Sequence, residues 1–555
     1  MTLAKPAHAD LLRVRWLGRV LYNEAWDLQR ALWEGRSRGR SNDDYLLLLE
    51  HPHTYTIGRN ANGSNLNVSH EHLGLIGAEV HYVDRGGDIT YHGPGQLVGY
   101  PIGAVKRLPR GYDMVGLVRR IEQMLVDTLA DLGVDSWVEE GLTGVWTERG
   151  KVAAIGIRVA RGVSMHGFAL NVAPDMSYFE HIVPCGISDR SVTSVQEVLG
   201  RDISLEEIVD VLLPHARALF DNEDLETQLG AFSRRSGRAF EVDDMIASGV
   251  FSPVKRGEIP ITIRGLLAGE PERPDWMRVK ADISSAGYRE MRKLMRSEGL
   301  TTVCEEAGCP NIYECWTSGT ATLMLLGDTC TRACSFCDVL TGKPGEVDLD
   351  EPKRAAQAIK TMNLEHAVLT SVNRDDLEDG GSAIFAETIE RIHDLLPSCD
   401  VEVLIPDFKG DEEALKTVMK ASPAVLNHNT ETVLRLQRDV RTAASYGRSL
   451  ALLARAKWLN PMGTVKSGLI VGMGETEHEV LGALADLRAV GVDIITIGQY
   501  LRPSARHRRI DRYVHPDEFA RYATEGVRLG IPHVEAGPLV RSSYHAKDVH
   551  AQAHV

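Results

Sequence analysis

The chain of 555 residues has a net charge of −15, and 43% of its residues are hydrophobic. This length is too great for a single hydrophobic core, so we expect at least two domains. The negative charge argues against a nucleic-acid-binding protein, which needs a basic surface. No apolar run is long enough to cross a membrane, and the first residues lack the apolar stretch of a secretory signal, so we expect a cytoplasmic protein.

Residues 1–222 mix strand-like and helical patterns. Apolar runs at 45–51 (YLLLLEH) and 151–159 (KVAAIGIRV) are typical of strands. Apolar residues at helical spacing predict a helix over 115–133. A basic cluster at 106–120 fits either a solvated helix face or a surface that attracts an acidic partner.

Four segments of this half contain candidate functional residues. The stretch 85–101 (RGGDITYHGPGQLVGYP) has seven Gly or Pro residues, so its backbone can approach a ligand closely. Lys151 lies near the start of the second strand-like run, GFALN occupies 167–171, and Cys185 lies in VPCG. Taken singly, the loop, the lysine and the cysteine also fit a glycine-rich hairpin, a solvated residue at a strand edge and a small core thiol.

In combination, these segments resemble the lipoyl(octanoyl) transferases over residues 11–220. The resemblance implies an α+β fold with a mixed sheet, which these transferases share with carrier-protein ligases. It also implies that Cys185 attacks an octanoyl thioester on acyl carrier protein and passes the octanoyl group to a lysine of a lipoyl-carrier domain. Lys151 would lower the pKa of the Cys185 thiol, because a nearby ammonium favours the thiolate. The residues implied to line the acyl pocket are Arg85, Gly86, Gly87, Asp88, Ile89, Thr90, Tyr91, His92, Ala154, Ile155, Gly156, Gly167, Phe168 and Ala169.

An ATP-dependent ligase is the alternative function for this half. Related carrier-protein ligases share the glycine-rich loop and the lysine but activate a free acid with ATP. They lack a cysteine in the VPCG setting, so Cys185 distinguishes the two activities. The phosphate-binding motif GxxxxGK[ST] does not occur in the sequence.

Residues 223–273 form the predicted joint between the two halves. The segment is polar, shows no sustained period and contains Pro253, Pro260 and Pro271. This composition is typical of a connection between domains. If all of it were flexible coil, its root-mean-square span would be roughly 35–40 Å.

The remaining residues, 274–555, alternate regularly between strand-like and amphipathic helical segments. This order predicts parallel strands with right-handed crossovers, an α/β partial TIM barrel of the type (β/α)6. Chemistry in such folds lies at the carboxyl ends of the strands, where Cys330 and the NRDD motif at 373–376 fall. The six strand-like runs are 320–326, 366–372, 401–406, 424–429, 467–473 and 493–499.

Three cysteines follow the first of these runs with the spacing C-x3-C-x2-C. Cys330, Cys334 and Cys337, here called the downstream triad, have no fourth cysteine at ligand spacing. A structural zinc site normally has four ligands, whereas three thiolates on a four-iron cube leave one iron open for a small molecule. The alternative is a zinc site completed by a distant histidine.

The downstream triad, in its barrel-like setting, resembles that of the radical S-adenosylmethionine enzymes. Cys304, Cys309 and Cys315, the upstream triad, precede it with the spacing C-x4-C-x5-C. Together with the motifs TGKP, DDLEDGGS, QYLRPS and GPLVRSSYHA, the two triads make residues 274–546 similar to lipoyl synthase. Biotin synthase is a weaker match, because the upstream triad and RSSY are not expected there.

The resemblance to lipoyl synthase implies two [4Fe–4S] clusters and S-adenosylmethionine as cofactors. The downstream triad would hold the cluster that binds S-adenosylmethionine. The upstream triad and Ser543 would hold an auxiliary cluster, and an oxygen ligand suits iron less well than a thiolate, so it can leave. We interpret Cys399, which lies outside both triads, as a buried core thiol.

The sequence therefore predicts two consecutive enzymes of lipoate assembly in one chain. The first transfers an octanoyl group and the second inserts two sulfurs, at C6 and C8. The alternatives are a ligase–synthase fusion and a non-catalytic, zinc-stabilised scaffold that binds carrier proteins. The expected partners are octanoyl-acyl carrier protein, the lipoyl-carrier domains of 2-oxoacid dehydrogenase complexes and of the glycine cleavage H protein, a low-potential electron donor and an iron–sulfur carrier.

Overall fold

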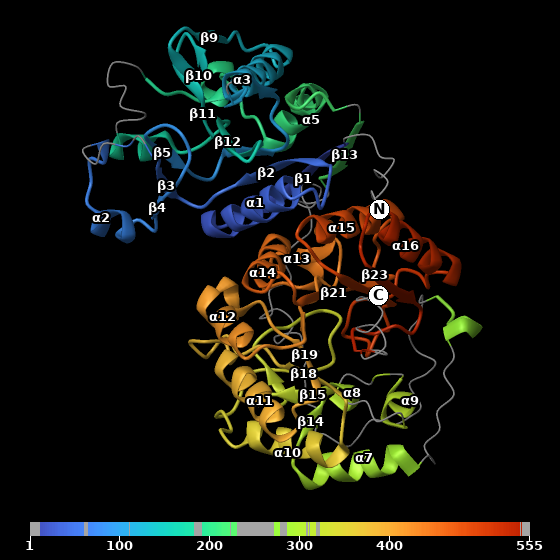
Figure 1. The fold of residues 1–555 in the computed structure, drawn as a ribbon. Coiled ribbons are helices and arrows are strands. Elements are labelled where there is room, and N and C mark those ends of the chain that lie inside the picture. Colours follow the sequence, from blue (N-terminus) through green and yellow to red (C-terminus); the bar gives the residue numbers. More distant parts are fainter. Residues whose placement is uncertain are drawn as a thin grey trace.

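The structure is a computed structural model with two eight-stranded sheets, one in each half of the chain (Figure 1). In the residues that it describes, no helix is both long and apolar enough to cross a membrane. Cys185 and most of the predicted joint lie outside these residues. The described residues are 11–59, 61, 65–109, 111–182, 191–222, 224–229, 271–277, 286–306, 309, 311–317, 322–543 and 546.

The sheet of the N-terminal half is mixed, as the sequence predicts. Its first three strands in spatial order run parallel, and the remaining neighbours are antiparallel. Both predicted strands are confirmed, as β2 and β11. The order across the sheet is β13 (Asp224–Gln228), β1 (Leu11–Arg19), β2 (Asp44–Glu50), β6 (Gln96–Ile102), β12 (Val163–Asn171), β11 (Gly150–Ala160), β10 (Leu142–Thr147) and β9 (Trp137–Glu139).

Helices cover both faces of this sheet because its strands are apolar on both faces. Leu46 and Leu48 of β2 join the cluster that contains the side chains of α3, whereas Leu47 and Leu49 join the cluster that contains those of α1. The predicted helix over 115–133 is confirmed as α3. The remaining elements of this half are a three-stranded sheet, a short ribbon and small helices. Their bounds are α1 (Tyr22–Ser37), α2 (His70–Leu75), α3 (Met114–Asp131), α4 (Val195–Leu199), α5 (Leu205–Ala216), β3 (Thr54–Ile57), β4 (Glu79–Tyr82), β5 (Ile89–His92), β7 (Arg107–Leu108) and β8 (Gly111–Tyr112).

Strand β13 lies in a stretch that the sequence assigns to the joint. It pairs in parallel with β1, with Leu11 opposite Asp224. The strand buries a charged side chain, because Glu226 lies in the interior and pairs with Arg13 and Arg15. A strand that buries a carboxylate lacks the apolar alternation by which strands are recognised, which explains why the sequence did not reveal it.

The sheet of the C-terminal half has seven parallel strands and one short antiparallel strand at an edge. All six predicted strands are present and pair in chain order, and the seventh, β23, was not predicted. In the described residues, β14 and β23 are the two edges. The order is β14 (Thr301–Thr302), β15 (Thr322–Leu325), β18 (His366–Ser371), β19 (Asp400–Leu404), β20 (Val425–Asn427), β21 (Thr464–Val471), β22 (Ile494–Gln499) and β23 (His533–Gly537).

Helices connect these parallel strands, as expected for crossover units. The clearest is α15, which begins with a capping box between Thr476 and Glu479 and is followed by Gly491 at a φ of 93°. A two-stranded ladder after β15 contains Cys330. The bounds are α7 (Ala286–Ser297), α8 (Val303–Glu306), α9 (Ile312–Thr317), α10 (Glu351–Met362), α11 (Ser382–Leu395), α12 (Glu412–Lys420), α13 (Gln437–Val440), α14 (Tyr446–Leu459), α15 (Glu477–Ala489), α16 (Pro516–Arg528), β16 (Thr329–Cys330) and β17 (Leu340–Thr341).

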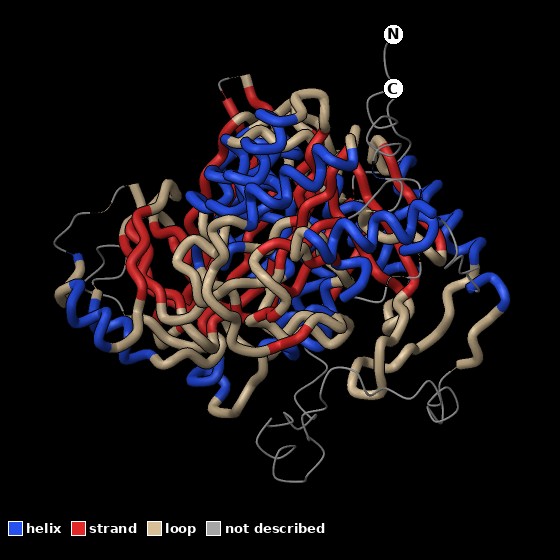
Figure 2. The backbone as a smooth tube through the Cα atoms, turned by 90° about the horizontal axis from the view of Figure 1, so that it is seen from below, coloured by secondary structure: helices blue, strands red, loops and turns tan. Residues whose placement is uncertain are grey.

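The two halves pack directly against each other through α1, which lies between its own sheet and helices α14 and α15 (Figure 1). Figure 2 shows from below how closely the helices and strands of the chain lie together. Leu28 of α1 lies against Gly447, and one cluster of buried apolar side chains extends across the boundary. Gly35 lies so close to α15 that an added Cβ would be 2.0 Å from the Ala489 carbonyl oxygen. Direct contact therefore connects the halves in addition to the joint.

A buried ion pair crosses the same boundary. Nε of Arg15 lies 2.9 Å from a carboxylate oxygen of Asp486, and both side chains are 2% exposed. The hydroxyls of Tyr45 and Tyr446 also donate to this carboxylate, at 3.2 and 3.0 Å. Two side chains from each half thus meet in one buried polar site, and the arrangement fixes the relative position of the two halves.

Candidate active sites

A cavity of about 580 Å³ opens at the carboxyl ends of strands β18 to β22 in the C-terminal half. Residues that follow these strands line it, among them Asn373, Asp407, Glu431 and Tyr500. All three cysteines of the downstream triad also line it. The fold therefore places the triad at the end of the sheet where the sequence predicts chemistry.

The surroundings of the downstream triad are suited to metal-bound sulfur. Backbone N–H groups of Arg332 and Asn373 donate to the sulfur of Cys330 at 3.4 and 3.3 Å. Burial raises the pKa of the Cys334 thiol to about 11 and that of Cys337 to about 12. Both groups are thus thiols at neutral pH in the protein alone, and the positive charge of bound iron would ionise them.

The upstream triad is only partly gathered around this cavity. Cys304, Cys309 and Ser543 line it, whereas Cys315, on α9, is not among its lining residues. The half-buried guanidinium of Arg541 interacts electrostatically with Cys309, and partial burial lowers the pKa of Arg541. The structure therefore brings three of the four predicted auxiliary ligands to the same cavity as the downstream triad.

The donor set of this cavity fits iron–sulfur clusters better than a single metal ion. Among the described residues, no three Cys, His, Asp or Glu side chains are grouped closely enough for one ion. A four-iron cube needs wider spacing, because each thiolate binds a different iron. The described cysteines are all free of disulfides, so their thiols are available as ligands.

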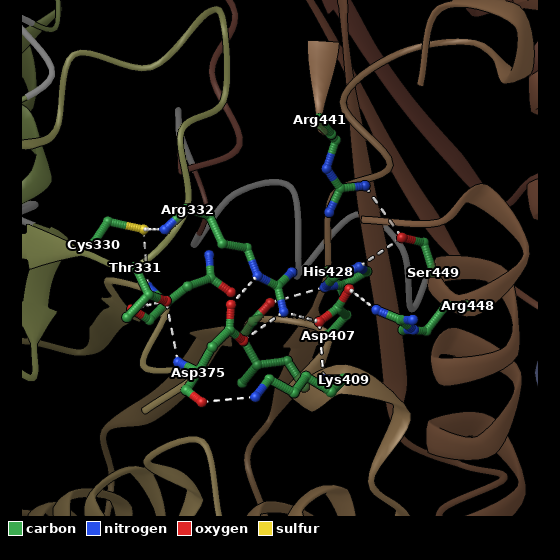
Figure 3. A network of polar contacts seen from close by, with 12 residues as sticks. Cys330, Thr331, Arg332, Asp375, Asp407, Lys409, His428, Arg441, Arg448 and Ser449 are labelled. Atoms are coloured by element: carbon green, nitrogen blue, oxygen red, sulfur yellow. Dashed lines mark hydrogen bonds and ion pairs between the residues drawn. The ribbon is translucent and has the colours of Figure 1, made fainter. Parts of the chain in front are cut away.

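An arginine–aspartate network supports the loop of the downstream triad (Figure 3). Nε of Arg332 donates to Asp375 at 2.7 Å, and one of its terminal nitrogens donates to Asp407 at 2.7 Å. Burial would raise the pKa of Asp407, but Arg332 and Arg448 hold it well below its usual range. Lys409 donates to the Asp375 carbonyl at 2.7 Å. The network fixes the chain between two of the predicted cluster ligands.

The sequence did not identify this network as part of the site. Arg332 lies inside the CTRAC motif, and Asp407 directly follows the third predicted strand. A charged residue at the carboxyl end of a parallel strand was the available signal. Glu431 was also missed, and it lines the cavity with a φ of 63°, which is unusual for a residue other than glycine.

The segments predicted to line the acyl pocket of the N-terminal half lie together. Strands β11 and β12 pair so that Ala154 faces Ala169 and Gly156 faces Gly167. The backbone N–H of Gly86 donates to the Ile157 carbonyl at 3.1 Å, which holds the glycine-rich loop against β11. A Cβ at Gly156 would lie 2.9 Å from the Gly86 carbonyl oxygen, so this close approach requires glycine.

The stretch 85–101 is not a simple hairpin, because its two strands belong to different sheets. Strand β5 pairs with β3 in the three-stranded sheet, whereas β6 pairs with β2 and β12 in the large sheet. The guanidinium of Arg85 is buried and donates to the carbonyl and hydroxyl oxygens of Thr56 at 2.7 and 2.9 Å. The chain thus crosses from one sheet to the other at the predicted pocket.

A cluster of aromatic and histidine rings adjoins this crossing. The ring of His92 stacks on Tyr22 of α1 and lies 5.7 Å from that of His51. Burial lowers the pKa of His51 to about 4, and burial together with His51 lowers that of His92 well below its ordinary value. Both rings are therefore neutral at neutral pH, so neither histidine adds charge beside the predicted acyl pocket.

Lys151 is buried rather than solvated at a strand edge, with an exposed fraction of 7%. Its ammonium nitrogen lies 5.1 Å from the ring centroid of Trp146. Its backbone pairs with the segment that follows residues 183–190, through bonds of 3.0 Å to the Ser191 carbonyl and from the Thr193 N–H. The lysine therefore lies beside the end of the segment that contains Cys185.

Comparisons with known proteins divide the chain in the same way. Residues 21–217 match the lipoyl protein ligase A/B catalytic domain, and residues 324–487 match the radical SAM superfamily. A solved bipartite lipoate protein ligase from Thermoplasma acidophilum is 18% identical, covers 40% of this chain and 88% of that chain, and has a TM-score of 0.33.

Two lipoyl synthases are much closer in sequence. That of Rubrobacter xylanophilus is 56% identical over 280 residues, which is 50% of this chain and 87% of the relative. That of Symbiobacterium thermophilum is 52% identical over 296 residues, which is 53% of this chain and 92% of the relative. The chain belongs to the lipoyl synthase family through its C-terminal half, to which a lipoyl protein ligase A/B catalytic domain is joined on the N-terminal side.

Proposed function

We propose that the chain transfers an octanoyl group from acyl carrier protein to a lysine of lipoyl-carrier domains and then inserts sulfur at C6 and C8. The observation that carries this proposal is a lipoyl synthase sequence, matched over 87% of a relative, in one chain with a lipoyl ligase A/B domain. The two activities are consecutive steps on one carrier-bound acyl group. We propose that the receiving lipoyl domains are those of 2-oxoacid dehydrogenases and of the glycine cleavage H protein.

In the proposed first reaction, the Cys185 thiolate attacks the thioester carbonyl, and the carrier thiol leaves with a proton. The amine of the receiving lysine then attacks the new thioester, and the Cys185 sulfur leaves. Lys151 supplies positive charge beside the thiolate and a route for protons in both steps. Its burial and its backbone bonds to residues 191 and 193 support this role. The paired segments 154–156 and 167–169, with residues 85–92, line the acyl chain.

Mass spectrometry after mixing the chain with octanoyl-acyl carrier protein tests this half. We expect an octanoyl adduct that is absent in Cys185→Ala and formed roughly 100-fold or more slowly in Lys151→Ala. Acylation that requires ATP and free octanoate would instead identify a ligase. A full-strength adduct in Cys185→Ala would contradict the assignment of the nucleophile.

In the proposed second reaction, the cavity of the C-terminal half holds two [4Fe–4S] clusters. When bound, the first cluster and S-adenosylmethionine would supply a carbon radical that removes hydrogen from an unactivated alkyl chain. The downstream triad holds that cluster, and the backbone donors to Cys330 and the arginine network keep its loop in place. The upstream triad and Ser543 would hold the auxiliary cluster, which would supply sulfur and be rebuilt by an iron–sulfur carrier. The low-potential electron donor would serve the first cluster.

The proposed architecture is a cytoplasmic chain of two catalytic domains. The C-terminal domain, from about residue 274, is a partial TIM barrel whose (β/α)6 core is extended by β23. The N-terminal domain extends through β13 to residue 228, so the joint is shorter than residues 223–273.

Iron and acid-labile sulfide in anaerobically purified protein test the cluster assignment, and zinc with no sulfide would favour a scaffold.

A further inference from the structure

Two acidic side chains of α1 face the synthase half. Glu24 and Asp27 lie one helical turn apart, and both are buried. Glu24 accepts a hydrogen bond from Nε of Arg448 at 2.6 Å, and Asp27 pairs with Arg455. Both arginines belong to α14 and lie two turns apart. The two ion pairs are therefore neighbouring bridges between the same two helices.

The bridges differ in what each arginine contacts next. Arg455 also contacts the Gly410 carbonyl at 2.8 Å and Glu412 at 3.4 Å. Arg448 instead lies 3.3 Å from the carboxylate of Asp407. The Arg448 contact is the one that reaches the side chain of Asp407, which lines the cavity, whereas Arg455 reaches only the backbone beside it, through Gly410.

Asp407 connects Arg448 to the loop of the downstream triad (Figure 3). Its other carboxylate oxygen accepts a hydrogen bond of 2.7 Å from Arg332. The backbone N–H of Arg332 in turn donates to the sulfur of Cys330 at 3.4 Å. Three ion pairs and one backbone hydrogen bond thus connect Glu24, in the transferase half, to a predicted cluster ligand in the synthase half.

The balance of charge explains why Glu24 matters to this series of contacts. Asp407 is fully buried and faces two guanidinium groups, those of Arg332 and Arg448. Glu24 balances Arg448, and Asp375 and Asp407 both pair with Arg332. With a neutral side chain at position 24, Asp407 would be the carboxylate that Arg448 retains. Because opposite charges attract strongly in a buried site and Arg332 keeps its pair with Asp375, Asp407 would shift towards Arg448 and loosen its contact with Arg332.

We propose that Glu24 is a positioning residue for the cluster-binding loop of the other half. It acts through Arg448, Asp407 and Arg332 and touches neither cluster nor substrate. This inference rests on the proposed function, in which the loop with Cys330 holds the first cluster. It assigns the transferase half a structural role in the second reaction.

The test compares Glu24→Gln with Asp27→Asn in the full chain. Each substitution removes one negative charge from the same helix and weakens one bridge to α14, but only Glu24 pairs with the arginine that contacts the Asp407 carboxylate. Glu24→Asp is the charge-conserving variant. Hydrogen exchange over residues 328–342 is measured in the metal-free protein. Affinity for S-adenosylmethionine and the electron paramagnetic resonance spectrum of the reduced cluster are measured after reconstitution.

In Glu24→Gln we expect exchange over 328–342 to be about fivefold faster or more, and S-adenosylmethionine to bind about fivefold more weakly or more. The resonance spectrum should change, Glu24→Asp should restore part of each effect, and Asp27→Asn should stay within about twofold of the parent. Equal changes in Glu24→Gln and Asp27→Asn, or none in the first, would overturn the proposal. A chain that binds no cluster would end the proposed function, while exchange in the metal-free protein would still decide the coupling.

Discussion

Replacing Asp486 with alanine perturbs the contact that fixes the two halves relative to each other. Asp486 accepts hydrogen bonds from Arg15, Tyr45 and Tyr446 in a site where the Arg15 and Asp486 side chains are 2% exposed. Removing one partner of a buried ion pair costs roughly 3–5 kcal/mol, because the other charge stays buried. We expect about 3 kcal/mol, since Glu226, 2.7 Å from Arg15, still balances its charge.

Hydrogen exchange followed by mass spectrometry measures this loss in the whole chain. A cost of about 3 kcal/mol makes opening of the α1–α15 contact about a hundredfold more favourable. The control is Glu477→Ala on the same helix, whose exposed pair with Arg521 is worth at most about 1 kcal/mol. Similar exchange of α1 and α15 in the two variants would refute the view that a buried charge holds the halves together.

Three further predictions concern packing, pH and the cysteines. Gly35→Ala should destabilise the chain by roughly 1–3 kcal/mol, because the new methyl would meet Ala489, whereas Gly74→Ala, with open space around it, should be slightly stabilising; urea unfolding that gives both the same sign would contradict this. Burial alone would raise the pKa of Glu402, but Lys466 and a histidine hold it at about 2, so its contribution to stability is full above pH 4.5 and is lost as the pH falls towards 2; melting temperatures that stay constant through this range would exclude it. Alanine at the downstream triad should abolish cleavage of S-adenosylmethionine, whereas alanine at the upstream triad should leave cleavage and stop sulfur insertion; lipoyl product from the second variant would disprove the sulfur-donor role.

The sequence predicted the elements whose patterns are locally complete. The six strands from 322 to 499 are mostly apolar and alternate with amphipathic helices, and α15 has its N-cap at Thr476. Strand β23 was missed because HVEAG is short and includes a charged residue. Strand β13 was missed because its buried Glu226 is balanced by Arg13 and Arg15, which lie more than two hundred positions earlier in the chain.

Candidate site residues could be proposed from the sequence where chemistry restricts the residue type. Cysteine spacing revealed both triads, and glycine content revealed the loop at 85–101. The supporting charges could not be predicted, because Glu24 on a helix resembles a solvent-facing residue until its partner is known. That partner, Arg448, lies 424 positions away and meets it only through the packing of α1 on α14.

The most direct test of the central claim follows one carrier protein through both reactions. The purified chain is mixed with octanoyl-acyl carrier protein and an apo lipoyl domain, and the mass of the domain is recorded before and after S-adenosylmethionine and a reductant are added. We predict an octanoyl group on the carrier lysine without ATP, followed by a gain of two sulfur atoms once both are present. A domain that stays unmodified, or that is octanoylated but never gains sulfur when both clusters are intact, would contradict the claim that one chain performs both steps.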